Sequence, residues 1–199
     1  MPGTENVWGR ETINMADHHV FSREDYSSND GMMTSIWGPP LWHSLHSLSF
    51  NFPTNPTKQD KKNYAGFLFS LGKVLPCRYC RDNFKDNVKA VGLDNNVFAN
   101  RENFSRFVYD LHEHVNSRLG KESGLSYEDV RDRYEAFRSR CLKGRAAKKR
   151  TKKGGKETGC VEPMYEGKKS KCVLRIVPKE SRRKTFSMHP QCALKKCNR

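Results

Sequence analysis

The sequence predicts an all-α protein: a four-helix bundle with a short fifth helix packed across it, followed by a basic C-terminal tail. Apolar residues within 36–141 recur at helical spacing, and no stretch there alternates apolar and polar side chains as a half-exposed strand would. Residues 1–141 hold 18 basic and 18 acidic side chains, whereas residues 142–199 hold 19 basic and 4 acidic ones. The formal charge of +15 therefore belongs to the tail. We expect a flexible leader over 1–35, a helical domain over 36–141 and a largely disordered tail over 142–199.

Prolines bound the first two predicted helices. Pro39 and Pro40 suit a first helical turn, where a missing N–H group costs no intrahelical hydrogen bond, and the first helix should end before Pro53. The second helix should begin near Thr57 and end at Pro76. The apolar stripes of the two helices are Leu41, Leu45, Leu48 and Phe52 in the first, and Tyr64, Phe67, Leu68, Leu71 and Leu75 in the second.

Capping residues mark the other three helices. The third should end at Gly92, and the fourth should run from an N-cap at Asn100 to Gly120. Ser126 with Asp129 three residues later resembles a capping box and opens the short fifth helix. The apolar positions are Cys80, Phe84, Val88 and Val91 in the third helix, Phe104, Phe107, Val108, Leu111, Val115 and Leu119 in the fourth, and Val130, Tyr134 and Phe137 in the fifth.

Composition limits the classes of protein to which the chain can belong. No run of about 18 or more apolar residues occurs, and residues 1–30 lack the apolar core of a secretory signal. We therefore expect a cytoplasmic protein without a membrane partner. Seven cysteines are too few at this length for a disulfide-rich secreted scaffold, so the closely spaced Cys77 and Cys80 favour redox or metal chemistry.

Cys77 and Cys80 form a Cys-x-x-Cys pair at the start of the third predicted helix. Unpaired amide N–H groups and the positive end of the helix dipole stabilise a thiolate at such a position. Arg78 and Arg81 add positive charge, and Pro76 fixes the turn before the pair. Because thiolates attack disulfides, we interpret Cys77 and Cys80 as catalytic redox residues.

Two alternatives remain for this pair: half of a zinc site, or two buried structural thiols. A zinc site needs two further Cys or His ligands, and none is close in the sequence. His112 and His114 could be recruited, but residues two apart on a helix diverge by about 200° and cannot both face one metal. We therefore expect no metal site.

Oxidation of a dithiol to a disulfide releases two electrons, so the redox interpretation requires an acceptor. A flavin would serve, and since the sequence has no Gly-x-Gly-x-x-Gly motif, it would have to bind between helices. Trp42 and His46 share a face of the first helix, and His112 and Asn116 share a face of the fourth. The alternative is that Trp42 is a core residue and that both histidines are ordinary helix-face residues.

Three motifs contain most of these residues. They are Trp37-Gly38-Pro39-Pro40-Leu41-Trp42-His43-Ser44-Leu45-His46 with Phe52-Pro53 after it, Leu75-Pro76-Cys77-Arg78-Tyr79-Cys80, and Leu111-His112-Glu113-His114-Val115-Asn116-Ser117-Arg118-Leu119-Gly120-Lys121. In order and spacing, over about residues 36–140, they resemble the Erv/ALR family of FAD-dependent sulfhydryl oxidases. The Trp-Gly-Pro-Pro start looks most like the short members encoded by large DNA viruses.

The resemblance implies a helical bundle that binds FAD, with the active-site disulfide against the isoalloxazine ring. Cys80 would be the flavin-proximal thiol, and Cys77 the interchange thiol attacked by protein dithiol substrates. Molecular oxygen would be the final acceptor, giving hydrogen peroxide, and the protein would be a homodimer. The residues that would line FAD are Gly38, Trp42, His46, His112, Val115, Asn116, Lys121 near the phosphates and Tyr134 near the adenine.

The tail carries further cysteines. Cys192 and Cys197 form a Cys-x4-Cys pair, and because some members of the family keep a mobile relay disulfide near the carboxyl end, they are candidates for a shuttle disulfide. The alternative is two unrelated thiols. Residues 142–170 are expected to be disordered, and Val173–Val177 fits a short strand. Three cysteines receive no role: Cys141, Cys160 and Cys172.

The basic charge of the tail suits an anionic partner, through neutralisation of phosphate groups. Solubility, a localisation signal around residues 148–153 and attraction to an acidic substrate would explain it equally. Aromatic side chains for base stacking do not alternate with the basic ones, so nucleic-acid binding is expected only as an accessory activity. A basic nucleic-acid-binding or zinc-binding helical protein is the alternative function. For a virus-type enzyme, the expected location is the host cytoplasm, the virus factory or the virion.

Overall fold

The computed structural model describes residues 22–142, 159–165, 170–178, 180–181 and 188–192. Its helices are α1 (Arg23–Ser27), α2 (Thr34–Phe50), α3 (Lys58–Val74), α4 (Arg78–Val91), α5 (Arg101–Arg118) and α6 (Tyr127–Glu135). Two short strands, β1 (Ser139–Leu142) and β2 (Gly159–Pro163), and a 3-10 turn, η2 (Pro190–Cys192), complete the described elements. The predicted helical fold class is confirmed.

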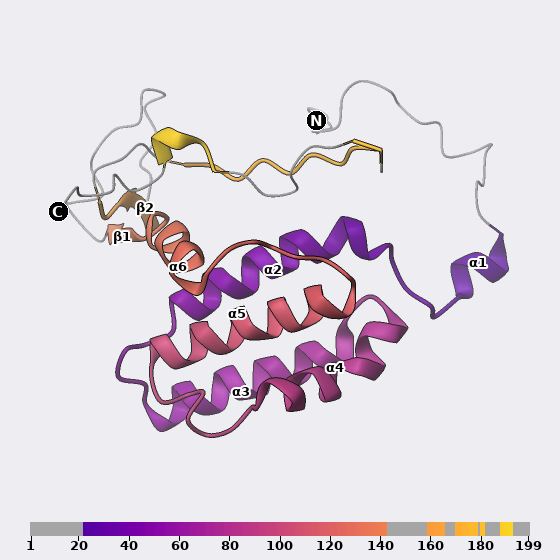
Figure 1. Ribbon diagram of the computed structural model, residues 1–199, viewed down its shortest axis with the longest axis horizontal. Coiled ribbons are helices and arrows are strands. Elements are labelled where there is room, and N and C mark those ends of the chain that lie inside the picture. The colour runs from indigo at the N-terminus through magenta and orange to yellow at the C-terminus, as the bar shows by residue number, and fades with distance from the viewer. Residues whose placement is uncertain (1–21, 143–158, 166–169, 179, 182–187, 193–199) are drawn as a thin grey trace, which may run out of the picture.

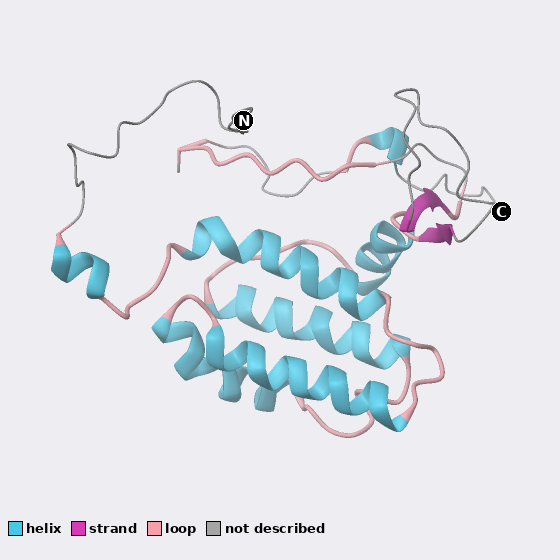
Figure 2. Cartoon of the chain, turned by 180° about the vertical axis from the view of Figure 1, so that it is seen from behind, coloured by secondary structure: helices cyan, strands magenta, loops and turns pink. Residues whose placement is uncertain are grey.

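Helices α2 to α5 form the bundle, and α6 lies across one end of it (Figures 1 and 2). Helix α5 contacts α2 on one side and α4 on the other, and α3 packs against α4. The main core lies between these helices and includes Leu45, Phe52, Leu68, Val88, Val97, Phe98, Phe104, Phe107, Val108 and Leu111. A smaller cluster of Phe50, Tyr127, Val130 and Tyr134 joins α6 to α2.

The predicted capping residues Asn100 and Ser126 act as caps, and Thr57, near which the second helix was predicted to begin, is a third. The side chains of Thr57, Asn100 and Ser126 each accept a hydrogen bond from the backbone N–H three residues later, at the starts of α3, α5 and α6. Gly92 ends α4 in the left-handed conformation, with φ of +87°, which favours glycine. These local signals therefore define most of the bundle's helix boundaries.

Helix α2 begins earlier than predicted. It starts at Thr34, so that Pro39 and Pro40 lie inside the helix rather than in its first turn. The additional turn is held by the Ile36 N–H, which donates to the Met33 carbonyl at 3.0 Å, and by the Trp37 indole N–H, which donates to the Met32 carbonyl at 3.0 Å. The helix therefore begins inside the leader predicted over 1–35.

The last part of that leader is ordered. Ser22 and Asp25 form a capping box at the start of α1, and residues 28–33 then run past the amino end of α4 (Figure 1). Gly31 forms an isolated antiparallel bridge with Cys77. A flexible segment was expected here because the local composition is polar and without periodicity, but contacts with residues distant in the sequence fix it.

The tail also departs from the prediction. Strands β1 and β2 pair antiparallel, and a disulfide joins Cys141 to Cys160, so part of the region expected to be disordered forms a small sheet. Arg138 anchors this sheet to the bundle, because its Nη2 donates to the Phe50 carbonyl at 2.8 Å. The strand expected over Val173–Val177 was wrong, since that segment has no regular secondary structure.

Among the residues that the structure describes, no helix combines the length and the apolar character needed to cross a membrane.

Candidate active site

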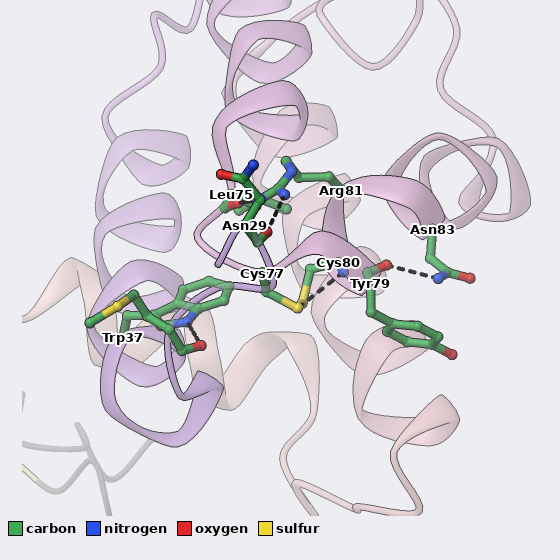
Figure 3. The surroundings of a disulfide bond; sticks show 9 residues. Asn29, Trp37, Leu75, Cys77, Tyr79, Cys80, Arg81 and Asn83 are labelled. Atoms are coloured by element: carbon green, nitrogen blue, oxygen red, sulfur yellow. Dashed lines mark hydrogen bonds between the residues drawn. A yellow bond between two sulfur atoms is a disulfide. The ribbon is translucent and has the colours of Figure 1, made fainter. Parts of the chain in front are cut away.

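Cys77 and Cys80 lie at the amino end of α4, as predicted. Cys77 is the N-cap of the helix, and its Sγ accepts a hydrogen bond from the backbone N–H of Cys80 at 3.1 Å. The two sulfurs form a disulfide whose Cα atoms are 5.2 Å apart, and both residues are half-buried (Figure 3). The helix thus points an amide N–H and its positive dipole end at the sulfur atom of Cys77.

The two neighbouring arginines do more than supply positive charge. Arg81 donates from Nη1 to the Leu75 carbonyl at 2.6 Å and so holds the turn that precedes the cysteines. Arg78 forms an ion pair with Asp30 at 2.9 Å, with both side chains exposed. The positive charge expected beside the disulfide is therefore partly balanced by the carboxylate of Asp30, a residue distant in the sequence.

The described residues contain no group of three or more His, Cys, Asp or Glu side chains that could hold a metal ion. The sulfurs of Cys77 and Cys80, the two ligands that a zinc site would need here, are bonded to each other.

Trp42 and three ring-bearing partners meet between α2, α5 and α6. Trp42 stacks on His112 with ring centroids 4.1 Å apart and an interplanar angle of 9°. His46 Nε2 lies 3.0 Å from His112 Nδ1, at hydrogen-bond distance. Tyr134 stacks on His46 with centroids 5.2 Å apart. We call Trp42, His46, His112 and Tyr134 the ring cluster; the structure brings together these four predicted site residues.

Burial controls protonation in the ring cluster. It lowers the pKa of His46 to about 3, with smaller contributions from the nearby charges of His112 and His43. It also lowers the pKa of His112 to about 4. Burial raises the pKa of Tyr134 above its usual range. At neutral pH all of these groups are therefore uncharged, and one imidazole donates a hydrogen bond to the other.

His46 offers a polar atom to a ligand. Its Nδ1 is buried and has no hydrogen-bond partner among the described residues, although its Nε2 is paired with His112. A buried unpaired polar atom costs about 1–3 kcal/mol unless a partner is supplied. This atom, in a cluster of aromatic and imidazole rings, fits a site for a planar heteroaromatic cofactor.

The remaining predicted cofactor residues lie along α2 and α5 and just beyond them. Gly38 lies near the start of α2, and a Cβ there would meet nothing within 4 Å. Val115 and Asn116 lie one turn beyond His112 on α5, and the backbone N–H of Lys121 donates to the Asn116 carbonyl at 2.9 Å. Val115, Asn116 and Lys121 thus follow His112 toward and past the end of α5, whereas Gly38 lies one turn before Trp42 on α2.

An open hollow of about 870 Å³ adjoins that end of α5. Polar and charged residues, among them Lys121, Ser117 and Ser123, line it together with Glu113 and Glu122. Arg118 of the same helix donates to Asn83 Oδ1 at 2.9 Å and so links this end of α5 to α4, the helix that begins at the cysteines. The hollow therefore presents Lys121 and hydroxyl groups beside the carboxylates of Glu113 and Glu122.

Sequence reasoning missed His43. Its Nδ1 lies 3.1 Å from the Tyr134 hydroxyl, at hydrogen-bond distance, and so connects α2 to α6 beside the ring cluster. The signal was present, since His43 precedes His46 by three residues and shares its helix face. Gly31 and Asp30 were also missed, and the sequence contains no local signal for their position beside Cys77.

The predicted shuttle pair stays a prediction, because only one of its two cysteines lies in the part of the chain that the structure describes. Cys192 is half-buried in η2 and has a free thiol, whereas Cys197 lies outside the described residues. Cys172 is free and exposed. The other two cysteines without a predicted role, Cys141 and Cys160, form a disulfide with each other.

Comparisons with known proteins place this arrangement in a family. The family model of the Erv1 / Alr family matches residues 39–135. A probable FAD-linked sulfhydryl oxidase of Acanthamoeba polyphaga mimivirus is 35% identical over 99 residues, which are 50% of this chain and 68% of the relative. An FAD-linked sulfhydryl oxidase of African swine fever virus is 28% identical over 99 residues, 50% of this chain and 80% of the relative.

The crystal structure of the FAD-binding domain of Erv1 from Saccharomyces cerevisiae resembles the chain with a TM-score of 0.47 and 25% identity, covering 52% of this chain and 94% of that one. The family-model match spans the ring cluster and the cysteine pair. By this match and by its identity to the mimivirus relative, the chain belongs to the Erv1/Alr family.

Proposed function

We propose that the protein is an FAD-dependent thiol oxidase that forms disulfide bonds in protein dithiols and passes the electrons to molecular oxygen. The observation that carries this proposal is the Cys77–Cys80 disulfide at the amino end of α4 in a member of a family whose relatives are FAD-linked sulfhydryl oxidases. The reaction consumes a dithiol and oxygen and yields a disulfide and hydrogen peroxide.

Thiol–disulfide exchange accounts for the first half of the reaction. A substrate thiolate attacks Cys77 Sγ, the bond between Cys77 and Cys80 breaks, and Cys80 leaves as a thiolate. The second substrate thiol then attacks the mixed disulfide and releases Cys77. The substrate has lost two electrons and two protons, and the enzyme pair has gained them.

Helix α4 assists this exchange. In the second step Cys77 is the leaving group, and exchange is faster when the departing thiolate is stabilised. The Cys80 N–H, which donates to Cys77 Sγ at 3.1 Å, and the helix dipole supply that stabilisation. The half-buried position of both cysteines leaves them accessible to a protein substrate.

The ring cluster and the hollow beside Lys121 are proposed to hold FAD. Bound there, FAD would supply the two-electron chemistry that connects the reduced cysteine pair with oxygen. Trp42, His46, His112 and Tyr134 would contact its rings, and His46 Nδ1 would gain the hydrogen-bond partner that it lacks. Lys121 would neutralise the diphosphate. The proposed site is completed by Gly38, Val115 and Asn116.

The partners and location follow as proposals from the family. We propose a homodimer that acts on protein dithiols in the host cytoplasm, the virus factory or the virion. The mimivirus and African swine fever virus relatives support a viral setting. The division into leader, oxidase domain over 36–141 and basic tail is retained as a proposal, with the tail available for accessory binding of anionic partners.

Absorption spectroscopy of the purified full-length chain tests the proposed function. We expect a yellow protein that releases FAD on denaturation, consumes oxygen when dithiothreitol is added and produces hydrogen peroxide. A colourless protein that consumes no oxygen would contradict the proposal. If such a protein instead bound DNA with strong salt dependence, the nucleic-acid-binding alternative would be favoured.

The shuttle proposal for Cys192 and Cys197 is tested separately. If the pair relays electrons from bulky substrates, the Cys192→Ser variant should oxidise a reduced protein more slowly than the unmodified chain and oxidise dithiothreitol at the same rate. Cys172→Ser is the matched control, because Cys172 is likewise a free thiol of the tail. Equal rates of protein oxidation in all three chains would contradict a relay.

A further inference from the structure

Residues Asp30–Met32, which we call the strap, lie alongside the turn that carries Cys77. Gly31 and Cys77 form an antiparallel bridge. The Met32 N–H donates to the Pro76 carbonyl at 2.8 Å, and the Arg78 N–H donates to the Asp30 carbonyl at 2.8 Å. The main chain is therefore held on both sides of Cys77 by a segment far away in the sequence.

Other groups fix the strap in turn. The Trp37 indole N–H donates to the Met32 carbonyl at 3.0 Å and so ties the strap to the first turns of α2 (Figure 3). Arg81 Nη2 donates to the Asn29 carbonyl at 3.3 Å, just before the strap. The Arg78–Asp30 ion pair adds little, because both side chains are exposed and water screens their attraction. Backbone pairing and the Trp37 bond therefore dominate.

Gly31 is required at its position for two reasons. Its φ of +126° lies where residues with a side chain are strained. A Cβ at this position would also lie 2.7 Å from Cys77 Cα and 2.7 Å from the Pro76 carbonyl oxygen. Both contacts are with backbone atoms, which cannot rotate away as a flexible side chain would. Any larger residue would therefore push the strap away from Cys77.

We propose that the strap holds Cys77 within bonding reach of Cys80 and thereby makes the disulfide harder to reduce, with Gly31 and Trp37 as positioning residues. This inference rests on the proposed redox role of the pair. When two groups are confined near each other, their effective concentration rises, and bond formation between them is favoured. A fixed Cys77 backbone leaves the reduced thiol near Cys80, whereas a released backbone lets it move away.

The equilibrium with glutathione measures this confinement. Two glutathione thiols reduce the Cys77–Cys80 disulfide to two protein thiols and are themselves oxidised to one glutathione disulfide, so electrons and protons balance. The full-length protein is equilibrated without oxygen in glutathione buffers, the thiols are alkylated, and the peptide holding Cys77 and Cys80 is quantified by mass. This readout is independent of flavin and of turnover.

Gly31→Ala should make the disulfide easier to reduce. We expect its equilibrium constant for reduction to rise about tenfold, which is about 30 mV for a two-electron couple. Trp37→Phe keeps an aromatic ring but removes the donor to Met32, and should shift the constant in the same direction by a smaller factor. The matched control is Gly92→Ala, which strains a left-handed glycine at the opposite end of α4 and has no atoms within 4 Å of the added Cβ.

The outcomes are distinct. An unchanged constant in both Gly31→Ala and Trp37→Phe would overturn the proposal, as would an equal shift in Gly92→Ala, which would indicate general loosening of α4. If Gly31→Ala fails to fold by circular dichroism, Trp37→Phe decides. A colourless unmodified protein would contradict the proposed oxidase function while the glutathione comparison still decides the role of the strap.

Discussion

Cys80→Ser is expected to abolish oxygen consumption with any dithiol substrate while leaving the protein yellow. A serine at this position cannot form a disulfide with Cys77, so a substrate thiol has no bond to exchange with. Loss of a covalent catalytic residue reduces turnover by roughly a thousandfold or more. The side chain of Cys80 is not part of the ring cluster, so the bound flavin should be retained. Steady-state oxygen consumption and the visible spectrum of the variant measure the two effects.

Cys77→Ser should be equally inactive, because both sulfurs are needed for the disulfide. Cys172→Ser is the matched control: this cysteine is exposed and free, so its loss should leave dithiothreitol oxidation unchanged. If Cys80→Ser kept a substantial part of the turnover, the assignment of the active-site pair would be wrong.

Acidification is expected to destabilise the protein through the buried histidines. The folded-state pKa values of His46 and His112, about 3 and about 4, lie below their ordinary value of 6.5. Below about pH 6.5 the unfolded chain therefore binds protons that the folded chain does not. The stability that the neutral buried histidines contribute is complete above about pH 6.5 and is lost as the pH falls to about 4 for His112 and to about 3 for His46. At about pH 5 the loss should be on the order of 1–2 kcal/mol for each histidine.

Chemical denaturation at about pH 7.5 and about pH 5 measures this loss. The double variant His46→Gln/His112→Gln removes both titrating groups and should show a clearly smaller difference between the two pH values than the unmodified chain. His114→Gln is the control, because His114 lies on the same helix but outside the ring cluster. An equally steep pH dependence in the double variant would show that other groups cause the acid destabilisation.

Local signals in the sequence account for most of the bundle. The apolar spacing of α3 and α5 and the side-chain caps at Thr57, Asn100 and Ser126 depend on residues within a few positions of one another, so the sequence reveals them directly. The placement of the Cys-x-x-Cys pair at a helix start is also local, because Pro76 interrupts the preceding helix.

Pairings between distant segments could not be predicted. The bridge between Gly31 and Cys77 joins a polar segment to a turn in another part of the chain, and neither has a strand pattern. Strands β1 and β2 are likewise short, and the disulfide between Cys141 and Cys160 was one of several possible pairings among seven cysteines. Polar composition alone suggested disorder in both regions. Composition carries no information about contacts between distant segments, and such contacts order both regions here.

The sequence predicted which residues form the candidate cofactor site, but not the contacts between them. Helical spacing placed Trp42 and His46 on one face, and His112 on a face of α5. It could not show that Trp42 stacks directly on His112, nor that Tyr134 reaches His43 from α6, because these contacts depend on how the three helices pack. The unpaired Nδ1 of His46 likewise becomes visible only in the folded structure.

The most direct measurement of the central claim is the rate at which bound flavin loses its colour when a dithiol is added in the absence of oxygen. If electrons enter through Cys77 and Cys80, the unmodified protein bleaches rapidly, whereas Cys77→Ser and Cys80→Ser keep their flavin yellow under the same conditions. Bleaching of either serine variant at the unmodified rate would show that the disulfide is not the route by which the electrons arrive.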